Sequence, residues 1–429
     1  METIIEPRDK VYGQIKVPGD KSISHRALLL SSMAGGNIEI EGLLEAEDIL
    51  STFNCLQKLG IKFGGDMEKL IVKGGGYPAF SEPDDILEAG NSGTTARLLL
   101  GILAGQPFFT AITGDSSLRK RPMGRVVEPL RKMGAQLDGR HEGALLPLMV
   151  RGGGLLPLNY TLPVASAQVK SALLLAASFA EGTTTIKEKI PSRDHTERML
   201  FYLGAKISWG KGGLIALEGP SQISGERIII PGDISSASFF MVGAALASKG
   251  ELLLEGVGVN PTRTGIIDVL LRMGADLKVL NKKEYNCEPV ADILVSAGKP
   301  LQGVQINAEM IPALVDEIPI IAVAALFARG ETVIKGAGEL RLKESDRLHT
   351  LTLELKKMGG KVTELPDGLI IEGGTGINGA HCCSHGDHRI AMALAVAALF
   401  AKNSSVIEGV EAVQVSFPHF FKLLEKTFS

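Results

Sequence analysis

The sequence repeats itself, and the repeat limits the possible folds more than any other feature. Six times, a helix of small apolar residues is followed by a glycine-containing turn and a strand rich in Ile, Val or Leu, at a period of about 70 residues. The six copies occupy residues 26–40, 97–112, 168–186, 238–254, 319–334 and 389–407. Because helices that are apolar on all faces are buried, we expect units that close around a shared helical core. The alternative for such a repeat is an open solenoid.

A second helix recurs between these units and ends in a Leu-Gly or Met-Gly pair before another strand. The five glycines are Gly60, Gly134, Gly204, Gly274 and Gly359. Glycine readily adopts the left-handed conformation that stops a helix, so we predict that conformation at all five. Each unit is then roughly βαβαββ, and residues 416–429 form the sixth, truncated second helix.

A larger symmetry is superimposed on the six units. The segment VPGDKSISHRALLL from Val17 resembles IPGDISSASFFMVG from Ile230, so one half of the chain repeats the other. We therefore predict two lobes of three units each, with crossovers at the two Pro-Gly-Asp segments. Residues 1–19 plus 230–429 form lobe I, and residues 20–229 form lobe II.

The composition argues against several classes of protein. Lys and Arg number 45 and Asp and Glu 48, a net charge of -3, so no overall field favours nucleic acid. The longest apolar runs, 318–328 and 390–401, are shorter than the roughly 18 residues that a membrane-spanning helix needs. Four cysteines, two of them adjacent, suggest no disulfide framework, and the first ten residues do not resemble a signal peptide. We expect a reduced, cytoplasmic protein without nucleic-acid or membrane partners.

Cationic side chains gather at predicted helix starts, where free N–H groups and the helix dipole attract anions. A lysine or arginine there is unfavourable unless an anion is bound. The residues that open four of the helices are Lys21, Ser22 and Arg26; Asn91, Ser92, Gly93, Thr94 and Arg97; Gln168 and Lys170; and His388 and Arg389. The fifth helix starts instead with Asp316 and Glu317. If these starts converge, they predict an enzyme that holds phosphate groups and transfers protons through a carboxylate.

Other motifs bear on which ligands the predicted anion site could bind. The cationic segments 118–122 and 341–347 strengthen the anion site, although a charge run is more often a solvated helix face. The sequence contains no phosphate-binding GxxxxGK[ST] and no GxGxxG between a strand and a helix, which argues against a nucleotide cofactor. Residues 381–388 are rich in His and Cys, but their spacing fits neither CxxC nor HExxH, so we expect no metal.

The segments PGDKSISHRALLL, GNSGTTARLL, RKRPMG, RLKESDRL and GDHRIAMALA together resemble the 5-enolpyruvylshikimate-3-phosphate synthase family across essentially the whole chain. The resemblance implies an α/β fold: a two-lobed inside-out α/β barrel of six βαβαββ repeats, three per lobe, joined by a double crossover. It implies transfer of the enolpyruvyl group of phosphoenolpyruvate to the 5-hydroxyl of shikimate 3-phosphate, with release of phosphate, through a tetrahedral intermediate. This step leads toward chorismate and the aromatic amino acids. The resemblance further implies a monomer with two small-molecule substrates and no cofactor.

The resemblance also implies roles for individual residues. Contacts with shikimate 3-phosphate fall to Lys21, Ser22, Arg26, Ser166, Gln168, Ser192, Arg193, Asp316 and Lys343. Contacts with phosphoenolpyruvate fall to Lys21, Asn91, Gly93, Thr94, Arg97, Arg121, Gln168, Arg347 and Arg389. Asp316 is expected to accept the 5-hydroxyl proton and Glu344 to protonate the methylene carbon. Lys21 and His388 are expected to assist the leaving phosphate.

The chain departs from the best-known members of that family at four positions. Ala167 replaces a serine, Glu339 an asparagine, His195 an aromatic residue and Val415 a lysine. These departures bear on individual contacts and resemble a more divergent branch of the family. Because Gly93 is not alanine, we expect the inhibitor glyphosate to compete with phosphoenolpyruvate.

Two other functions compete with this interpretation. The first is UDP-N-acetylglucosamine enolpyruvyl transfer, whose enzymes share the fold but usually carry a cysteine in the loop that corresponds to residues 114–125, where this chain has none. The second is a catalytically silent repeat protein that binds an anionic partner. A silent binder has no need of Asp316 beside clustered arginines, nor of Glu344 between Lys343 and Arg347.

Overall fold

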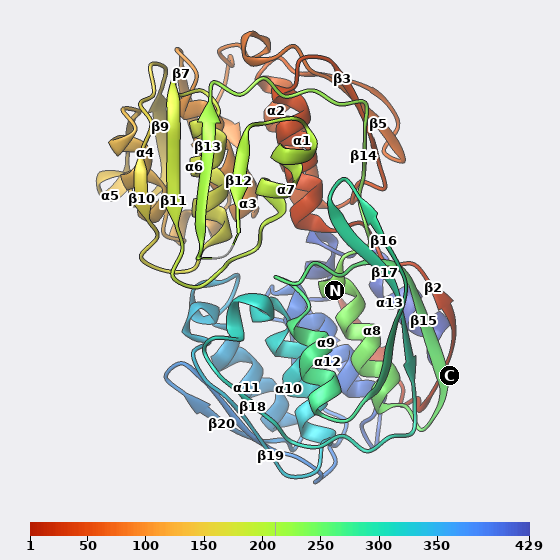
Figure 1. The fold of residues 1–429 in the computed structure, drawn as a ribbon. Coiled ribbons are helices and arrows are strands. Elements are labelled where there is room, and N and C mark those ends of the chain that lie inside the picture. Colours follow the sequence, from red (N-terminus) through yellow and green to blue (C-terminus); the bar gives the residue numbers. More distant parts are fainter. Residues whose placement is uncertain (211) are drawn as a thin grey trace. The chain divides into compact units, whose positions relative to one another are not determined.

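The computed structural model describes residues 1–210 and 212–429, which divide into two compact units (Figure 1). Unit 1 comprises Met1–Pro18, Pro231–Lys283 and Pro289–Ser429, and unit 2 comprises Gly19–Ile230 and Glu284–Glu288. The boundaries expected at residues 19 and 230 lie beside these breaks. The segment Glu284–Glu288 belongs to unit 2, which no pattern in the sequence indicated. Each unit is a mixed α/β structure with its own hydrophobic core.

The described residues of unit 2 form three four-stranded sheets that share one pairing pattern. In each sheet the first strand is parallel to the second, and the other pairs are antiparallel. The strand orders are β14 (Arg227–Ile229), β3 (Asn37–Glu41), β5 (Lys69–Lys73), β4 (Lys62–Gly65); β6 (Leu87–Glu88), β7 (Phe109–Thr113), β9 (Leu145–Arg151), β8 (Gln136–Gly139); and β10 (Asn159–Thr161), β11 (Gly182–Lys187), β13 (Leu214–Gly219), β12 (Ile207–Trp209).

Unit 1 also has three sheets, two of which include a strand from the start of the chain. The strand orders are β16 (Asp276–Tyr285), β17 (Glu288–Ser296), β15 (Lys249–Gly258), β2 (Lys10–Ile15); β18 (Gln305–Ile306), β19 (Glu331–Ile334), β21 (Gly368–Glu372), β20 (Lys361–Leu365); and β1 (Glu2–Ile5), β23 (Ser405–Glu408), β22 (His381–Cys383). In the last sheet β22 is parallel to β23 and β1 is antiparallel to it. The N-terminal strand therefore takes a place in the sheet of the sixth repeat.

Helices from the six repeats are buried inside the units, as predicted. They are α1 (Lys21–Met33), α3 (Gly93–Ala104) and α6 (Ala167–Ala177) in unit 2, and α8 (Ile234–Leu246), α10 (Ile318–Phe327) and α12 (His388–Leu399) in unit 1. Helix α3 contacts both α1 and α6, and α8, α10 and α12 contact one another (Figure 1). A Cβ on Gly101 would lie 2.2 Å from the Ala172 carbonyl oxygen, so α3 and α6 approach this closely only because residue 101 is glycine.

The second helices bury one face only, and the first five full-length ones end at the predicted glycines, whereas α13 ends near the end of the chain without one. They are α2 (Glu47–Lys58), α4 (Gly124–Lys132), α7 (His195–Tyr202), α9 (Gly265–Arg272), α11 (Arg347–Lys357) and α13 (Phe420–Thr427), with α5 (Arg140–Gly143) a single irregular turn. Gly60, Gly134, Gly204, Gly274 and Gly359 have φ values of 90°, 102°, 90°, 90° and 85°. The left-handed conformation predicted at these stops is confirmed. Among the described residues, no helix combines the length and the apolar character needed to cross a membrane.

The repeated Pro-Gly-Asp segments have a local explanation. The carboxylate of Asp20 accepts a hydrogen bond from Ile23 N at 2.8 Å, and that of Asp233 accepts one from Ser235 N at 2.8 Å. Each aspartate thus caps the first buried helix of its half, α1 or α8. An N-cap carboxylate pairs with N–H groups that have no partner within the helix, which accounts for the same three letters at both positions.

Candidate active-site residues

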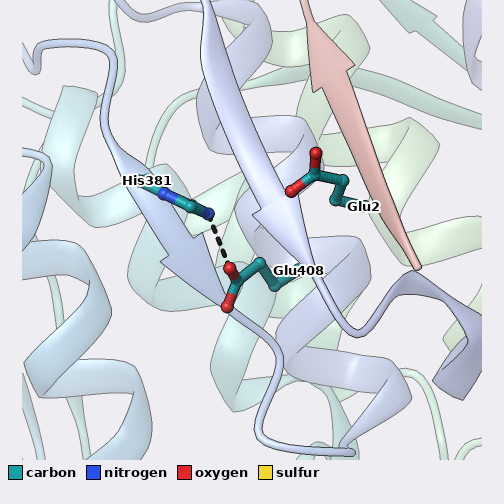
Figure 2. A group of neighbouring side chains, drawn as sticks. All are labelled: Glu2, His381 and Glu408. Atoms are coloured by element: carbon teal, nitrogen blue, oxygen red, sulfur yellow. Dashed lines mark ion pairs between the residues drawn. The ribbon is translucent and has the colours of Figure 1, made fainter.

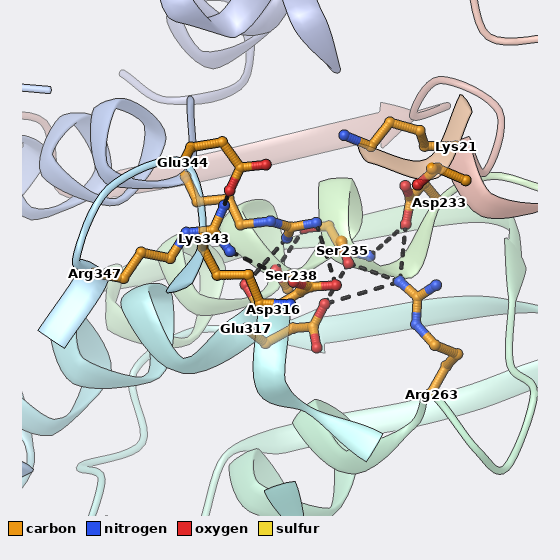
Figure 3. Close-up of polar contacts among 12 residues, drawn as sticks. Lys21, Asp233, Ser235, Ser238, Arg263, Asp316, Glu317, Lys343, Glu344 and Arg347 are labelled. Carbon is orange, nitrogen blue, oxygen red and sulfur yellow. Dashed lines mark hydrogen bonds and ion pairs between the residues drawn. The ribbon is translucent and has the colours of Figure 1, made fainter. Parts of the chain in front are cut away.

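In unit 1, carboxylates surround the buried guanidinium of Arg347, the first residue of α11 (Figure 3). Nε donates to Asp387 Oδ2 at 2.7 Å, Nη2 to Glu344 Oε2 at 2.5 Å and Nη1 to Asp316 Oδ1 at 3.5 Å. Arg347 is 2% exposed, whereas Glu344 is 20% and Asp316 13% exposed. Burial lowers the pKa of Arg347, but the charges of Asp387 and Glu344 outweigh burial and raise it above the usual arginine value. Arg347 is therefore a permanent cation with two partners that solvent reaches.

The two carboxylates of the predicted pair, Asp316 and Glu317, point toward different partners in the structure. Both residues lie in a 3-10 turn, η4 (Val315–Glu317), directly before α10. The Asp316 carboxylate points toward Arg347 and also lies 3.7 Å from Arg389 Nη2. Glu317 is fully buried; it accepts a hydrogen bond from Ser235, which also receives one from Arg263 at 2.7 Å (Figure 3). Asp316 thus faces Arg347 and Arg389, whereas the buried Glu317 lies beside Ser235 and 3.9 Å from Arg263.

The start of α12 supplies further groups to the same cluster. Asp387 caps this helix by accepting from Arg389 N at 2.9 Å and also holds Arg347. Arg389 Nη1 donates to the Asp316 carbonyl oxygen at 3.0 Å. His388, the first residue of α12, is buried. Lys343 lies in a different segment, between the 3-10 turn η5 (Gly338–Leu342) and α11, with Nζ 3.8 Å from Glu339 Oε1.

In unit 2, the starts of α3 and α6 are joined by polar side chains. Arg97 donates through Nη1 to Gln168 Oε1 at 2.9 Å, and Gln168 Nε2 donates to Thr94 Oγ1 at 3.1 Å. Nearby, Arg121 Nη2 donates to Asn91 Oδ1 at 2.7 Å. All five residues were predicted to contact phosphoenolpyruvate, and the structure brings Arg97, Gln168 and Thr94 into one network and Arg121 and Asn91 into another.

Gly93 begins α3 beside these arginines. A Cβ at this position would lie 2.7 Å from Arg97 Nη1 and 3.6 Å from Arg121 Nη1. The first distance is too short for an undisturbed contact, so any larger residue must displace the Arg97 guanidinium. The size of residue 93 therefore controls the position of a cation.

The start of α1 holds the predicted shikimate 3-phosphate contacts Lys21, Ser22 and Arg26. Lys21 Nζ lies 2.9 Å from Asp48 Oδ2 in a partly exposed ion pair. Arg26 is buried and donates to the Ser22 carbonyl oxygen at 2.9 Å, to Thr196 Oγ1 at 2.7 Å and to Ser171 Oγ at 2.7 Å. Burial lowers the pKa of Arg26 to about 10. Arg26 therefore joins α1, α6 and α7 through its guanidinium.

The remaining predicted contacts with shikimate 3-phosphate lie at the start of α6 and before α7. Ser166 caps α6, with Oγ 3.5 Å from Val169 N. Ser192 is buried and donates to Glu188, and Arg193 beside it is partly exposed. His195 is buried, with Nδ1 2.7 Å from Glu288 Oε1. The sequence suggested that Lys170 binds an external anion. In the structure, its Nζ is instead paired with Glu188 and Glu197 of its own unit.

The sequence model of the family described as EPSP synthase (3-phosphoshikimate 1-carboxyvinyltransferase) matches residues 5–424. The chain belongs to the EPSP synthase family. Since the match runs through nearly all of both units, family membership applies to the whole chain rather than to one module.

Individual relatives and solved structures agree with this family. A 3-phosphoshikimate 1-carboxyvinyltransferase of Pelotomaculum thermopropionicum is 53% identical over 415 residues, 96% of each chain. One of Thermosynechococcus vestitus is 53% identical over 418 residues, 96% of this chain and 94% of the relative. A solved structure of an EPSP synthase from Acinetobacter baumannii superposes with a TM-score of 0.89 at 42% identity, covering 100% of this chain and 98% of that one. The resemblance inferred from five short motifs is confirmed at the level of the family.

Residues 381–388, which superficially suggested a metal site, make separate contacts. His385 Nε2 lies 2.8 Å from Glu354 Oε1, Cys382 is buried, and Asp387 contacts Arg347. Within residues 1–210 and 212–429, the one group of three side chains close enough to share an ion is Glu2, His381 and Glu408 (Figure 2). All three are exposed on neighbouring strands. Glu2 lies opposite Glu408 in the β1–β23 register, and His381 forms a 2.9 Å ion pair with Glu408. These two contacts account for their proximity, so we assign no metal there.

Several residues of these clusters were missed by the sequence analysis. They are Asp48, Asp387, Glu188, Glu197, Arg263 and Glu317 in its buried role. Asp387 had a visible signal, because it precedes His388 and Arg389 at a helix start, where aspartate is a preferred cap. The others meet their partners from distant parts of the sequence and carried no comparable local signal.

Proposed function

We propose that this chain transfers the enolpyruvyl group of phosphoenolpyruvate to the 5-hydroxyl of shikimate 3-phosphate and releases phosphate. Membership of the EPSP synthase family supports the activity. The single structural observation that carries the chemistry is the Arg347 cluster, in which two solvent-accessible carboxylates, Asp316 and Glu344, lie on one permanently charged guanidinium. A cation between two candidate proton-transfer groups is the combination that an addition-elimination on an anionic substrate needs.

Anion binding is the first task that we assign to these residues. The residues that we assign to the carboxylate and phosphate of phosphoenolpyruvate are Arg347 and Arg389 in unit 1 and, in unit 2, Arg97, Arg121, Gln168, Asn91, Gly93 and Thr94. Ser22, Arg26, Ser166, Ser192, Arg193 and Lys343 take shikimate 3-phosphate, and Lys21 serves both substrates. Guanidinium groups suit this task because they bind carboxylates and phosphates through two parallel hydrogen bonds.

Binding of phosphoenolpyruvate prepares Glu344 for proton transfer. In the structure Glu344 contacts Arg347 at 2.5 Å, and a carboxylate on a guanidinium holds a proton poorly. The anionic groups of phosphoenolpyruvate compete with Glu344 for Arg347. Once displaced from the cation, Glu344 binds a proton more readily and becomes the donor to the methylene carbon.

Asp316 completes the addition and Glu344 completes the elimination. As Glu344 protonates the methylene carbon, the 5-hydroxyl oxygen attacks C2 of phosphoenolpyruvate, and Asp316 accepts the hydroxyl proton. The resulting tetrahedral intermediate then loses phosphate while a proton leaves the new methyl group for Glu344, which restores the double bond. Lys21 and His388 assist the departing phosphate.

The decisive experiment is phosphate release by the purified protein, with each substrate omitted in turn. We expect release only when shikimate 3-phosphate and phosphoenolpyruvate are both present. UDP-N-acetylglucosamine in place of shikimate 3-phosphate serves as the control for the rival transferase and is expected to give no phosphate. A folded protein that releases no phosphate from the two proposed substrates, or that prefers the nucleotide sugar, would overturn the proposal.

We extend the proposal to the architecture and setting of the enzyme. The three sheets and three buried helices of each unit support an inside-out α/β barrel of two lobes, 1–19 plus 230–429 and 20–229, joined by a double crossover. We also propose a cytoplasmic monomer, following the family resemblance. Size-exclusion chromatography with light scattering tests the monomer: a mass near 45.5 kDa is expected, and twice that mass would contradict it.

A further inference from the structure

Lys170 is a fully buried cation in the first turn of α6. Its Nζ lies 2.8 Å from Glu188 Oε2, 2.8 Å from Glu197 Oε1 and 3.2 Å from the Ser192 carbonyl oxygen. Lysine has three N–H donors, so these three acceptors occupy all of them. Glu188 directly follows β11, Ser192 lies in the loop after it, and Glu197 lies in the first turn of α7. One side chain therefore joins α6 to three successive parts of the chain.

Burial of the Lys170 ammonium group costs hydration free energy, which the surrounding contacts must compensate. Lys170 and Glu197 are each 1% exposed, and Glu188 is 4% exposed. Charges removed from water are tolerated only when geometry and hydrogen bonding compensate the lost hydration. Burial raises the pKa of Glu197, and Lys170 opposes that rise. Without Lys170, two carboxylates would remain in an apolar interior.

The segment that Lys170 holds is the loop of residues 188–194, between β11 and α7. Ser192 is fixed twice within it: its carbonyl oxygen accepts from Lys170, and its hydroxyl donates to Glu188, which Lys170 also contacts. Arg193 follows directly. At its other end, Lys170 lies two residues after Gln168 on the same helix. The lysine thus sets the position of Ser192 and Arg193 relative to the start of α6, where Ser166 and Gln168 lie.

We propose that Lys170 is a positioning residue for shikimate 3-phosphate, which holds Ser192 and Arg193 in the geometry that binds this substrate. The inference rests on the proposed function, in which those two residues and the start of α6 contact shikimate 3-phosphate. Lys170 itself does not touch the substrate, because its three donors are committed to protein acceptors. Loss of Lys170 weakens shikimate 3-phosphate binding and leaves phosphoenolpyruvate binding unchanged.

The test uses a charge-neutral double variant, Lys170→Met with Glu188→Gln, which removes one cation and one anion together. Titration calorimetry measures the Kd of shikimate 3-phosphate, and steady-state kinetics measures KM for each substrate. We expect Kd and KM for shikimate 3-phosphate to rise on the order of tenfold or more, because charge-assisted hydrogen bonds are among the strongest in proteins. KM for phosphoenolpyruvate is expected to stay within about twofold. Lys206→Met with Glu218→Gln removes an exposed ion pair of the same unit and is the matched, charge-neutral control.

The outcomes separate this inference from the proposed function. Wild-type protein that neither binds shikimate 3-phosphate nor releases phosphate would overturn the proposed function. Normal wild-type behaviour together with unchanged shikimate 3-phosphate binding in the double variant would overturn the positioning role alone, as would an equal rise in KM for both substrates. If the double variant does not fold, Lys170→Arg tests the positioning role instead. This substitution keeps the positive charge but replaces the compact ammonium group by a planar guanidinium group. A selective rise in Kd for shikimate 3-phosphate supports the role, and an unchanged Kd overturns it.

Discussion

Arg347 in unit 1 and Lys170 in unit 2 are both buried cations surrounded by carboxylates, but their partners differ in exposure. Two partners of Arg347, Asp316 and Glu344, are 13% and 20% exposed. The partners of Lys170, Glu188 and Glu197, are 4% and 1% exposed. A partner that water reaches can be exchanged for a substrate anion, whereas a partner sealed from water cannot. We therefore propose that the same pairing of charges serves ligand exchange in unit 1 and fixed positioning in unit 2.

The largest effect is expected from Asp316→Asn, which removes the proposed base and keeps its shape. We expect kcat to fall by about 10²–10⁴, the usual contribution of a general base, while the Kd of shikimate 3-phosphate stays close to that of the wild type. Phosphate-release kinetics and calorimetry measure the two quantities. Asp85→Asn alters an exposed carboxylate, 74% exposed, and is the control. A kcat within threefold of wild type would remove Asp316 from the chemistry.

The next effect concerns the stability of unit 2. Lys170→Met leaves two buried carboxylates without their cation and is expected to lower the free energy of unfolding by about 3–5 kcal/mol. Glu344→Gln, which alters a partly exposed partner of Arg347, is expected to cost less than about 1 kcal/mol. Urea denaturation measures both by circular dichroism. Trp209, the one tryptophan in the sequence, lies in β12, so its fluorescence reports on unit 2. Equal costs for the two substitutions would contradict the contrast in partner exposure.

Glu344→Gln should instead affect catalysis. We expect kcat to fall by about 10²-fold, since glutamine cannot donate the proton that the methylene carbon receives. Addition followed by elimination in D₂O exchanges methylene hydrogens of phosphoenolpyruvate with solvent, and mass spectrometry of recovered substrate should show slower exchange in the variant. Glu372→Gln, at an exposed surface pair, provides the comparison. Exchange at the wild-type rate would assign the proton to another group.

The sequence predicted those parts of the molecule whose physical causes are local. Three of these parts depend on neighbouring residues: the six repeated apolar helices, the glycines such as Gly60 that end helices, and the cations at helix starts. Their patterns are therefore visible along the chain. The partners of the cations are different, because Lys170 meets Glu197 and Arg347 meets Asp387 only after the helices pack. The sequence therefore located the candidate residues but could not separate an exchangeable cation from a fixed one. For Lys170 it predicted an external anion, and that prediction is wrong.

A smaller effect is expected from Gly93→Ala, which tests whether Arg97 belongs with the exchangeable cations. The added methyl group would lie 2.7 Å from Arg97 Nη1, so the guanidinium must move. We expect KM for phosphoenolpyruvate to rise by roughly tenfold, about 1.4 kcal/mol, and inhibition by glyphosate to weaken with it. Gly210→Ala, where an added Cβ meets nothing within 4 Å, is the control. An unchanged KM would show that the position of the Arg97 guanidinium does not affect phosphoenolpyruvate binding.

The smallest effect is expected from His25, a buried base whose side chain contacts a hydroxyl group, whereas Arg347 and Lys170 contact carboxylates. His25 Nδ1 lies 2.7 Å from Thr52 Oγ1, and burial, with the charges of Lys21 and Arg26, holds the pKa of His25 well below its usual 6.5. As pH falls below 6.5, the unfolded chain binds a proton that the folded chain refuses, so stability declines in acid. Between pH 7.5 and 5.5 we expect this histidine to cost about 1 kcal/mol. In His25→Gln, which can still contact Thr52, that part of the decline should vanish. Urea denaturation of both proteins by Trp209 fluorescence at the two pH values measures it, and the same pH dependence in both would show that His25 is not the group that titrates.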